Sequence, residues 1–291
     1  MGRVRARFHA FKVHDNSPMT RIFATSVGHL LHRASSRAVL GAAVAIALFA
    51  SPAYSQADTT GWKFELTPYV WGAGMSGTVS VNDRPQNGLT VEQSFSDIFS
   101  VLQFALMGSF EARKGRWGAF TDGIYFKVND EGTLTGKRGF ATLSANADLA
   151  QQVYSLAGSY RVGQGKSPID VFAGARLASI GWDVDIALST PAVLARERTF
   201  SETKSWVDPY IGARVETPLG TRWALGAYAD VGGFGVSSDI ATQAMATVRF
   251  KFTPGIIGNL GFRVITDDYA KDGFKYDMMN GGAMIGVSFR W

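Results

Sequence analysis

Acidic and basic side chains recur at alternate positions in many segments after residue 57, and they are the residues best equipped for chemistry in this chain. Alternate side chains of a strand point to the same face. Acids and bases are nearly equal in number, and a buried charge is costly unless it is paired, so we expect these groups to pair with one another inside the protein. The predicted network consists of Glu65, Glu111, Arg113, Asp122, Arg161, Asp170, Arg176, Asp208, Arg214, Glu216, Asp230, Arg249, Arg263 and Arg290.

Histidine and cysteine, the usual sources of catalytic bases, nucleophiles and metal ligands, are missing from most of the chain. The four histidines (His9, His14, His29 and His32) all precede residue 57, and there is no cysteine. The later segment therefore lacks the usual general base, a thiolate and the commonest metal ligand. The glycine pattern of residues 72–77 is followed by more strand-like sequence, which argues against a dinucleotide site. We predict no catalytic residue, cofactor or metal site.

The first 57 residues have the features of a secretory signal peptide. Residues 38–50 form an apolar run that follows Arg33 and Arg37 and precedes a small-residue cleavage motif. The run is shorter than the roughly 18 to 20 residues that span a bilayer, which disfavours a membrane anchor. We predict a removed signal peptide at 1–57, export through the Sec pathway and one mature domain at 58–291. Because the region before the apolar run is long, Met19 is an alternative start to Met1.

The high isoelectric point belongs to the N-terminal segment. Residues 1–57 hold seven of the 29 basic side chains and one of the 24 acidic ones, which leaves the rest of the chain with a net charge of −1. A nucleic-acid partner is not expected for such a surface.

The sequence after residue 57 predicts an all-β domain. Segments with apolar residues at alternate positions recur between turn residues, whereas a sustained helical period is absent. They cover roughly 62–81, 101–113, 116–128, 147–162, 168–185, 204–217, 221–236, 239–252, 256–268 and 276–291. The connections at 82–100, 129–146 and 186–203 are long and polar, and those between them are short. This alternation is typical of an antiparallel transmembrane β-barrel, here of about ten strands, with eight or twelve as alternatives.

The two faces of the expected strands predict how such a barrel would sit. One face is apolar and would contact lipid, while the charged face would line the lumen. A solvated face of a soluble sheet is the alternative for the charges, and the apolar opposite face argues against it. Four tryptophans at strand ends, Trp62, Trp117, Trp223 and Trp291, are predicted to form an aromatic girdle at the membrane surface.

Several segments together indicate a family resemblance. Residues 65–71 (ELTPYVW), 110–117 (FEARKGRW), 174–176 (GAR), 206–214 (WVDPYIGAR) and 230–235 (DVGGFG) carry it. Over about residues 60–291 the chain resembles a poorly characterised group of proteobacterial outer-membrane proteins, distantly similar to OmpA and OmpW barrels. The final strand ends on an aromatic residue, and in such barrels this ending, here Val287, Phe289 and Trp291, is the signal read by the barrel assembly machinery. The resemblance implies the Gram-negative outer membrane, with lipid and lipopolysaccharide as surroundings, and transfers no catalytic residue.

These observations predict a non-enzymatic envelope or surface protein with a charge-paired lumen that passes small solutes only to a limited extent. A selective small-molecule channel of the OmpW kind is the first alternative. An outer-membrane hydrolase is the second, disfavoured because such enzymes use a histidine. The sequence leaves the transported solute and the oligomeric state open.

Overall fold

The computed structural model describes residues 61–81, 89–135, 142–163, 165–190 and 193–291, and the predicted signal peptide lies outside them. In these residues the elements are β1 (Trp62–Val81), β2 (Leu89–Gln93), α2 (Phe95–Ser100), β3 (Leu102–Lys114), β4 (Trp117–Thr135), β5 (Thr142–Arg161), β6 (Ile169–Thr190), β7 (Val193–Leu219), β8 (Trp223–Gly232), β9 (Ser238–Thr253), β10 (Ile256–Lys271) and β11 (Phe274–Arg290).

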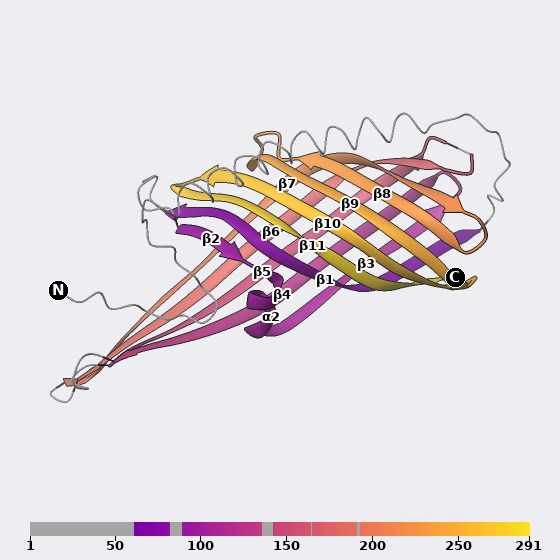
Figure 1. Ribbon diagram of the computed structural model, residues 1–291. Helices are drawn as coiled ribbons and strands as arrows, with labels where there is room; N and C mark the ends of the chain where they lie inside the picture. Colours follow the sequence, from indigo (N-terminus) through magenta and orange to yellow (C-terminus); the bar gives the residue numbers. More distant parts are fainter. Residues whose placement is uncertain (1–60, 82–88, 136–141, 164, 191–192) are drawn as a thin grey trace, which may run out of the picture.

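The strands form one closed antiparallel barrel (Figure 1). From β3 to β11 each strand pairs with the next along the chain, β1 pairs with β3, and β11 returns to pair with β1. The barrel wall therefore has ten strands, with β2 as an additional short strand on β1. This confirms the predicted all-β antiparallel barrel and its strand number.

The alternation of side chains in β11 shows how the wall separates an inside from an outside. Ile285 is 62% exposed on the outer face, while its neighbour Met284 is 6% exposed and points into the lumen. Val287 and Phe289 share the outer face with Ile285, and Ser288 is buried inside. The apolar residues of the final strand thus lie outward, as expected for a strand with one apolar and one polar face.

The chain ends in the barrel wall. The amide of Trp291 donates to the carbonyl oxygen of Phe64 at 3.2 Å, and the amide of Phe64 donates to the carbonyl oxygen of Trp291 at 2.9 Å. The two rings stack with their centroids 5.7 Å apart. Backbone pairing and ring stacking therefore fix the last residue, which explains how a chain end can carry a large aromatic side chain.

Two hairpins are longer than the sequence predicts. We expected loops over 129–146 and 186–203, but β4 and β5 stay paired as far as Thr135 and Thr142, and β6 and β7 as far as Thr190 and Val193. Figure 1 shows these strands projecting beyond the rest of the barrel. The expectation was wrong because it relied on apolar alternation, whereas the ladder of backbone hydrogen bonds does not require that side-chain pattern.

The connection between β1 and β3 also contains more structure than predicted, namely β2 and α2. Ser94 and Asp97 form a capping box, in which the amide of Asp97 donates to Ser94 Oγ and the amide of Ser94 to Asp97 Oδ2. A helix of six residues is too short to give a periodic apolar pattern. No helix in the described residues is long and apolar enough to cross a membrane.

Closure of the barrel brings two glycines into close contact. A Cβ on Gly282 of β11 would lie 1.9 Å from the carbonyl oxygen of Gly72 in β1. We expect Gly282→Ala to lower the free energy of unfolding by about 1–3 kcal/mol, the usual cost of overpacking, because it disturbs the pairing of β1 with β11. The yield of refolded barrel should fall as well. Heat-dependent mobility on SDS gels measures that yield. Gly158→Ala is the matched control, because nothing lies within 4 Å of its new Cβ, and an equal loss in both variants would contradict the prediction.

Candidate functional site

The predicted charged residues line the lumen, and they meet in successive groups along the barrel axis. Nearest the C-terminal end, Glu65 of β1 contacts Arg249 and Arg290, each at 2.5 Å. Arg249 also pairs with Glu216 of β7, and Arg290 lies 3.7 Å from the same carboxylate. This group joins four strands by placing each carboxylate between two guanidinium groups.

The next group has Asp170 at its centre. This buried carboxylate accepts hydrogen bonds from Arg113 at 2.6 Å, Arg161 at 2.7 Å and Arg214 at 3.2 Å. Glu111 accepts hydrogen bonds from Arg113 at 2.8 Å and from Arg214 at 2.5 Å, so two carboxylates are shared among three guanidinium groups. Arg214 lies on β7 and Glu111 on β3, with β4, β5 and β6 between them, and their contact therefore crosses the lumen.

A third group bridges the lumen through Arg263 of β10. Its guanidinium donates to Asp122 of β4 at 2.7 Å, to the hydroxyl oxygen of Tyr69 at 2.7 Å and to Gln243 at 2.8 Å. The hydroxyl of Tyr69 in turn donates to Asp122 at 2.9 Å. On the shorter way round the barrel, β11, β1 and β3 stand between β10 and β4. A fixed ion pair therefore lies across the middle of the lumen.

The most deeply buried ion pair is that of Arg176 and Asp230. Their nearest atoms are 2.6 Å apart, and their side chains are 3% and 0% exposed. Tyr228 donates to the same carboxylate at 2.6 Å, and Arg176 donates to Ser155 at 3.2 Å. The guanidinium of Arg176 lies 4.9 Å from the ring centre of Tyr210, in the geometry of a cation–π contact.

Asp208 differs from the other members of the predicted network, because its neighbour is a hydroxyl group and not a base. Ser238 Oγ lies 2.6 Å from Asp208 Oδ2 and 2.7 Å from Asp267 Oδ1, and the amide of Ser238 donates to Asp208 at 2.8 Å. A hydroxyl group has one hydrogen to donate. One of the two carboxyl groups must therefore carry a proton if both contacts are hydrogen bonds.

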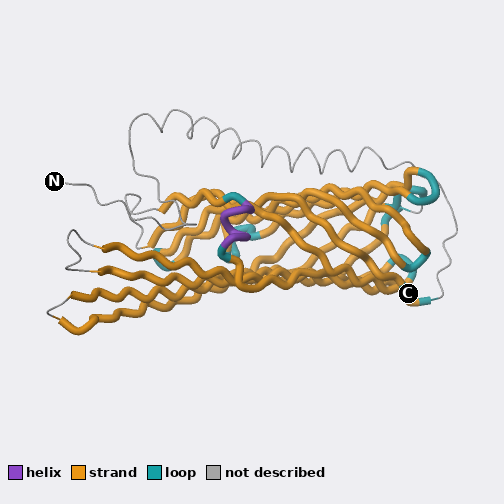
Figure 2. The backbone as a smooth tube through the Cα atoms, turned by 60° about the horizontal axis from the view of Figure 1, so that its bottom comes forward, coloured by secondary structure: helices purple, strands orange, loops and turns teal. Residues whose placement is uncertain are grey.

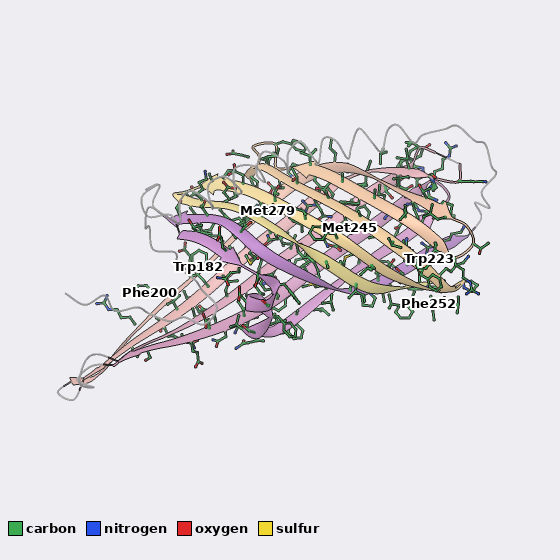
Figure 3. All side chains as sticks on the ribbon, viewed as in Figure 1. Trp182, Phe200, Trp223, Met245, Phe252 and Met279 are labelled. Carbon is green, nitrogen blue, oxygen red and sulfur yellow. The ribbon has the colours of Figure 1, made fainter. Side chains whose placement is uncertain are left out.

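Aromatic side chains pack in the lumen between the charges, and the sequence pattern did not predict them. Phe120, Phe172, Tyr210 and Tyr228 form one buried cluster. Met245, near the middle of the barrel in Figure 3, packs against this cluster and against a second one that contains Tyr69. In each strand these aromatic residues lie an even number of positions from a charged residue and therefore face the same side. That spacing could have predicted their place in the lumen.

At the C-terminal end the lumen contains a cavity of about 770 Å³. Its charged lining is more basic than acidic and consists of Lys63, Glu65, Glu111, Arg113, Asp122, Arg161, Lys166, Asp170, Arg214, Glu216, Arg249, Arg263 and Arg290. Arg263 and Asp122 belong both to this lining and to the bridge across the lumen, so the cavity reaches that bridge. Among the described residues no cluster of histidine, cysteine and acidic side chains is arranged to hold a metal ion.

The four tryptophans predicted to form a girdle are exposed on the outside of the barrel. Trp62, Trp117 and Trp223 each begin a strand, the latter two after short turns, and Trp291 pairs with the start of β1. Figure 3 shows Trp223 and Phe252 at the end of the barrel where the chain terminates. The exposed tryptophans therefore gather at one end of the wall, and their role at a membrane surface stays a prediction.

The closed antiparallel barrel is a fold that outer-membrane proteins of known structure also have. The outer membrane protease OmpT from Escherichia coli has a similar structure, with a TM-score of 0.52 and 10% sequence identity over 83% of this chain and 100% of that one. The translocator domain of the autotransporter NalP from Neisseria meningitidis gives a TM-score of 0.35 and 13% identity, covering 94% of this chain and 99% of that one. No family model matches the sequence. No curated protein matches it either.

The group around Asp170 yields a stability prediction. Asp170→Asn removes the anion shared by three guanidinium groups, and breaking a buried ion pair typically costs about 3–5 kcal/mol. We therefore expect the urea concentration at the midpoint of unfolding, measured in lipid vesicles, to be lower for this variant than for the wild type. Asp183→Asn, on an exposed part of the same strand, is the control and should leave the midpoint nearly unchanged. Equal midpoints for wild type and Asp170→Asn would show that the network does not hold the barrel together.

Proposed function

We propose that this protein is a non-enzymatic outer-membrane barrel whose lumen is closed by its own charge pairs, so that small solutes pass only to a limited extent. The observation that carries the proposal is the Arg263–Asp122 bridge, which joins distant strands across the middle of the lumen. Arg176 and Asp230 form a second, buried pair, which lies beside the aromatic cluster that contains Tyr210 and Tyr228.

The size of the barrel supports a closed lumen. About eight strands enclose a space that side chains can fill, and ten strands enclose one only slightly wider. In this barrel the additional space holds stacked aromatic rings and paired arginines, such as Arg214 at 5.4 Å from the ring centre of Phe120. Widening the lumen would separate buried opposite charges, which is costly in a low-dielectric interior.

The outer surface supports the proposed location in the outer membrane, in contact with lipid and lipopolysaccharide. Large apolar side chains such as Leu106, Leu156 and Leu260 are exposed on the outer face of the wall, where hydrocarbon would cover them. The exposed tryptophans at the C-terminal end would lie at the periplasmic headgroups. The long hairpins would then face the cell exterior. Export through the Sec pathway and delivery by the barrel assembly machinery through Val287, Phe289 and Trp291 belong to the same proposal.

An enzymatic role is the alternative that the likeness to a protease raises, although that likeness concerns the fold alone. The described residues contain no histidine or cysteine. Asp230 Oδ2 accepts hydrogen bonds from Arg176 and Tyr228, and Asp208 accepts from Ser238, so neighbouring side chains already hold each carboxylate in place. The proposal therefore keeps these groups in a structural role.

Single-channel recording in planar bilayers tests the closed lumen. We expect wild-type protein to give rare, small conductance steps and the double variant Arg176→Ala/Arg263→Ala to give steps several-fold larger, because both ion pairs at mid-lumen are lost. The urea midpoint of the double variant should also fall. Heat-dependent mobility on gels verifies that the recorded variant is a folded barrel.

Lys275→Ala provides the matched control for the recordings. It also removes a positive charge, but from an exposed position in β11, and it should leave the conductance steps unchanged. Large, frequent steps from the wild type would contradict the closed lumen and favour a selective channel of the OmpW kind. Peptide hydrolysis by wild type that disappears in Asp208→Ala would instead favour an enzyme.

A further inference from the structure

Strand β1 changes its neighbour halfway along its length. Residues Trp62 to Pro68 pair with β3, whereas Met75 to Val79 pair with β2. Between them, residues 69–74 have no ladder partner on this edge in the described structure, although β11 pairs along the other edge. Residues 102–107 of β3 likewise pair only with β4. The barrel wall therefore has a seam between β1 and β3 that backbone hydrogen bonds do not close.

Helix α2 covers this seam without being firmly packed against it. The ring of Phe95 lies 3.3 Å from the position that a Cβ on Gly72 would occupy, which brings the helix onto β1. None of the residues of α2 is buried, and Phe95 and Phe99 are exposed. Figure 2 shows the helix on the flank of the barrel, away from the C-terminal end. A loosely seated helix thus lies, through the ring of Phe95, over the stretch of β1 that lacks a strand partner.

A cavity of about 100 Å³ passes through the wall at the seam. Val70 and Trp71 both line it, although they are neighbours in β1 and point to opposite faces. Val70 is 60% exposed on the outer surface, and Trp71 is 7% exposed inside. The cavity therefore connects the outer face with the lumen. Most of its other lining is apolar and includes Met75, Phe99, Leu102, Met107, Ile124 and Val153.

Two buried polar atoms among the residues that line this cavity lack hydrogen-bond partners in the described structure. They are Gln151 Oε1, an acceptor, and Arg176 Nη1, a donor. The amide nitrogen of Gln151 is already used, because it donates to Tyr276 at 3.3 Å. Leaving a buried polar group unpaired costs about 1–3 kcal/mol. The site thus combines apolar walls with an unused acceptor and an unused donor.

We propose that the seam is a lateral binding site for a small apolar molecule that carries one hydroxyl group and enters from the surrounding lipid. The hydroxyl donates to Gln151 Oε1, and the apolar part lies among Trp71, Met107 and Ile124. An apolar cavity of about 150 Å³ can hold benzene, so this cavity encloses the polar end of such a ligand while the rest extends toward the lipid. The proposal goes beyond the closed lumen and does not depend on it.

The comparison of 4-bromophenol with 4-bromotoluene tests the ligand class, because the two molecules differ in the hydroxyl group. Bromine quenches tryptophan fluorescence on contact, and Trp71 and Trp206 both line the cavity. With the refolded full chain in phosphatidylcholine nanodiscs, we expect saturable quenching by 4-bromophenol that excess phenol reverses. At equal concentrations in the membrane, 4-bromotoluene should bind roughly two- to tenfold more weakly, as expected for one lost hydrogen bond.

Three variants locate the site. Gln151→Leu should reduce the affinity for 4-bromophenol to that for 4-bromotoluene. Gln93→Leu, the same change at a buried glutamine of β2 outside the cavity, should leave both affinities unchanged. Ala105→Phe fills the cavity from β3 without adding a tryptophan and should abolish saturable quenching by both molecules. Heat-dependent mobility on gels identifies the folded fraction of each variant.

Two results would overturn the proposal. Equal affinities of the wild type for the two molecules would mean that the hydroxyl group is not recognised. Unsaturable quenching that is identical in wild type and Ala105→Phe would mean that water or lipid alone occupies the seam. Neither result depends on the conductance of the lumen, so failure here is distinct from failure of the closed-lumen proposal.

Discussion

Backbone hydrogen bonding is the constraint on which the rest of this structure depends. In a hydrocarbon environment an unpaired backbone amide or carbonyl costs several kcal/mol, so a sheet in a membrane has to close on itself. Here the closing ladder joins the first strand of the barrel to the last, and it includes the terminal residue Trp291. The close approach of Gly282 to Gly72 and the stacking of Trp291 on Phe64 are consequences of that closure.

Closure also determines the chemistry of the interior. Ten strands leave little room, so inward side chains meet those of distant strands as well as those of their neighbours. Charges placed there have to be neutralised at short range, and the bridges from Arg263 to Asp122 and from Arg214 to Glu111 do this across the lumen. The aromatic rings between them exclude water and give the guanidinium groups flat surfaces to lie on, as Arg263 does over Trp71. The interior thus combines paired charges and packed aromatic rings with a cavity at its C-terminal end.

The sequence predicted the wall better than its contents. Apolar alternation predicted the strands of the barrel and their two faces, because the outward side chains of each strand are largely apolar and recur at every second position. The alternation did not predict which charges pair with one another. Arg263 and Asp122, for example, lie 141 positions apart and meet only through the register of the closed sheet. The extended hairpins and the six-residue helix α2 were not predicted, because neither carries a sustained apolar period. The contact of Ser238 with Asp208 was not predicted either, because nothing in the sequence around Ser238 indicates it.

Strand β1 has to satisfy two demands that conflict. It completes the barrel along one edge by pairing with β11 over nearly its whole length, while its other edge is divided between β3 and β2. The change of partner leaves backbone groups near Gly72 without a ladder partner on that edge. Placing Phe95 over that backbone is the arrangement the chain adopts, and a side chain shields polar groups without bonding them. The wall is consequently weakest between β1 and β3, which is also where its outer surface connects with the lumen.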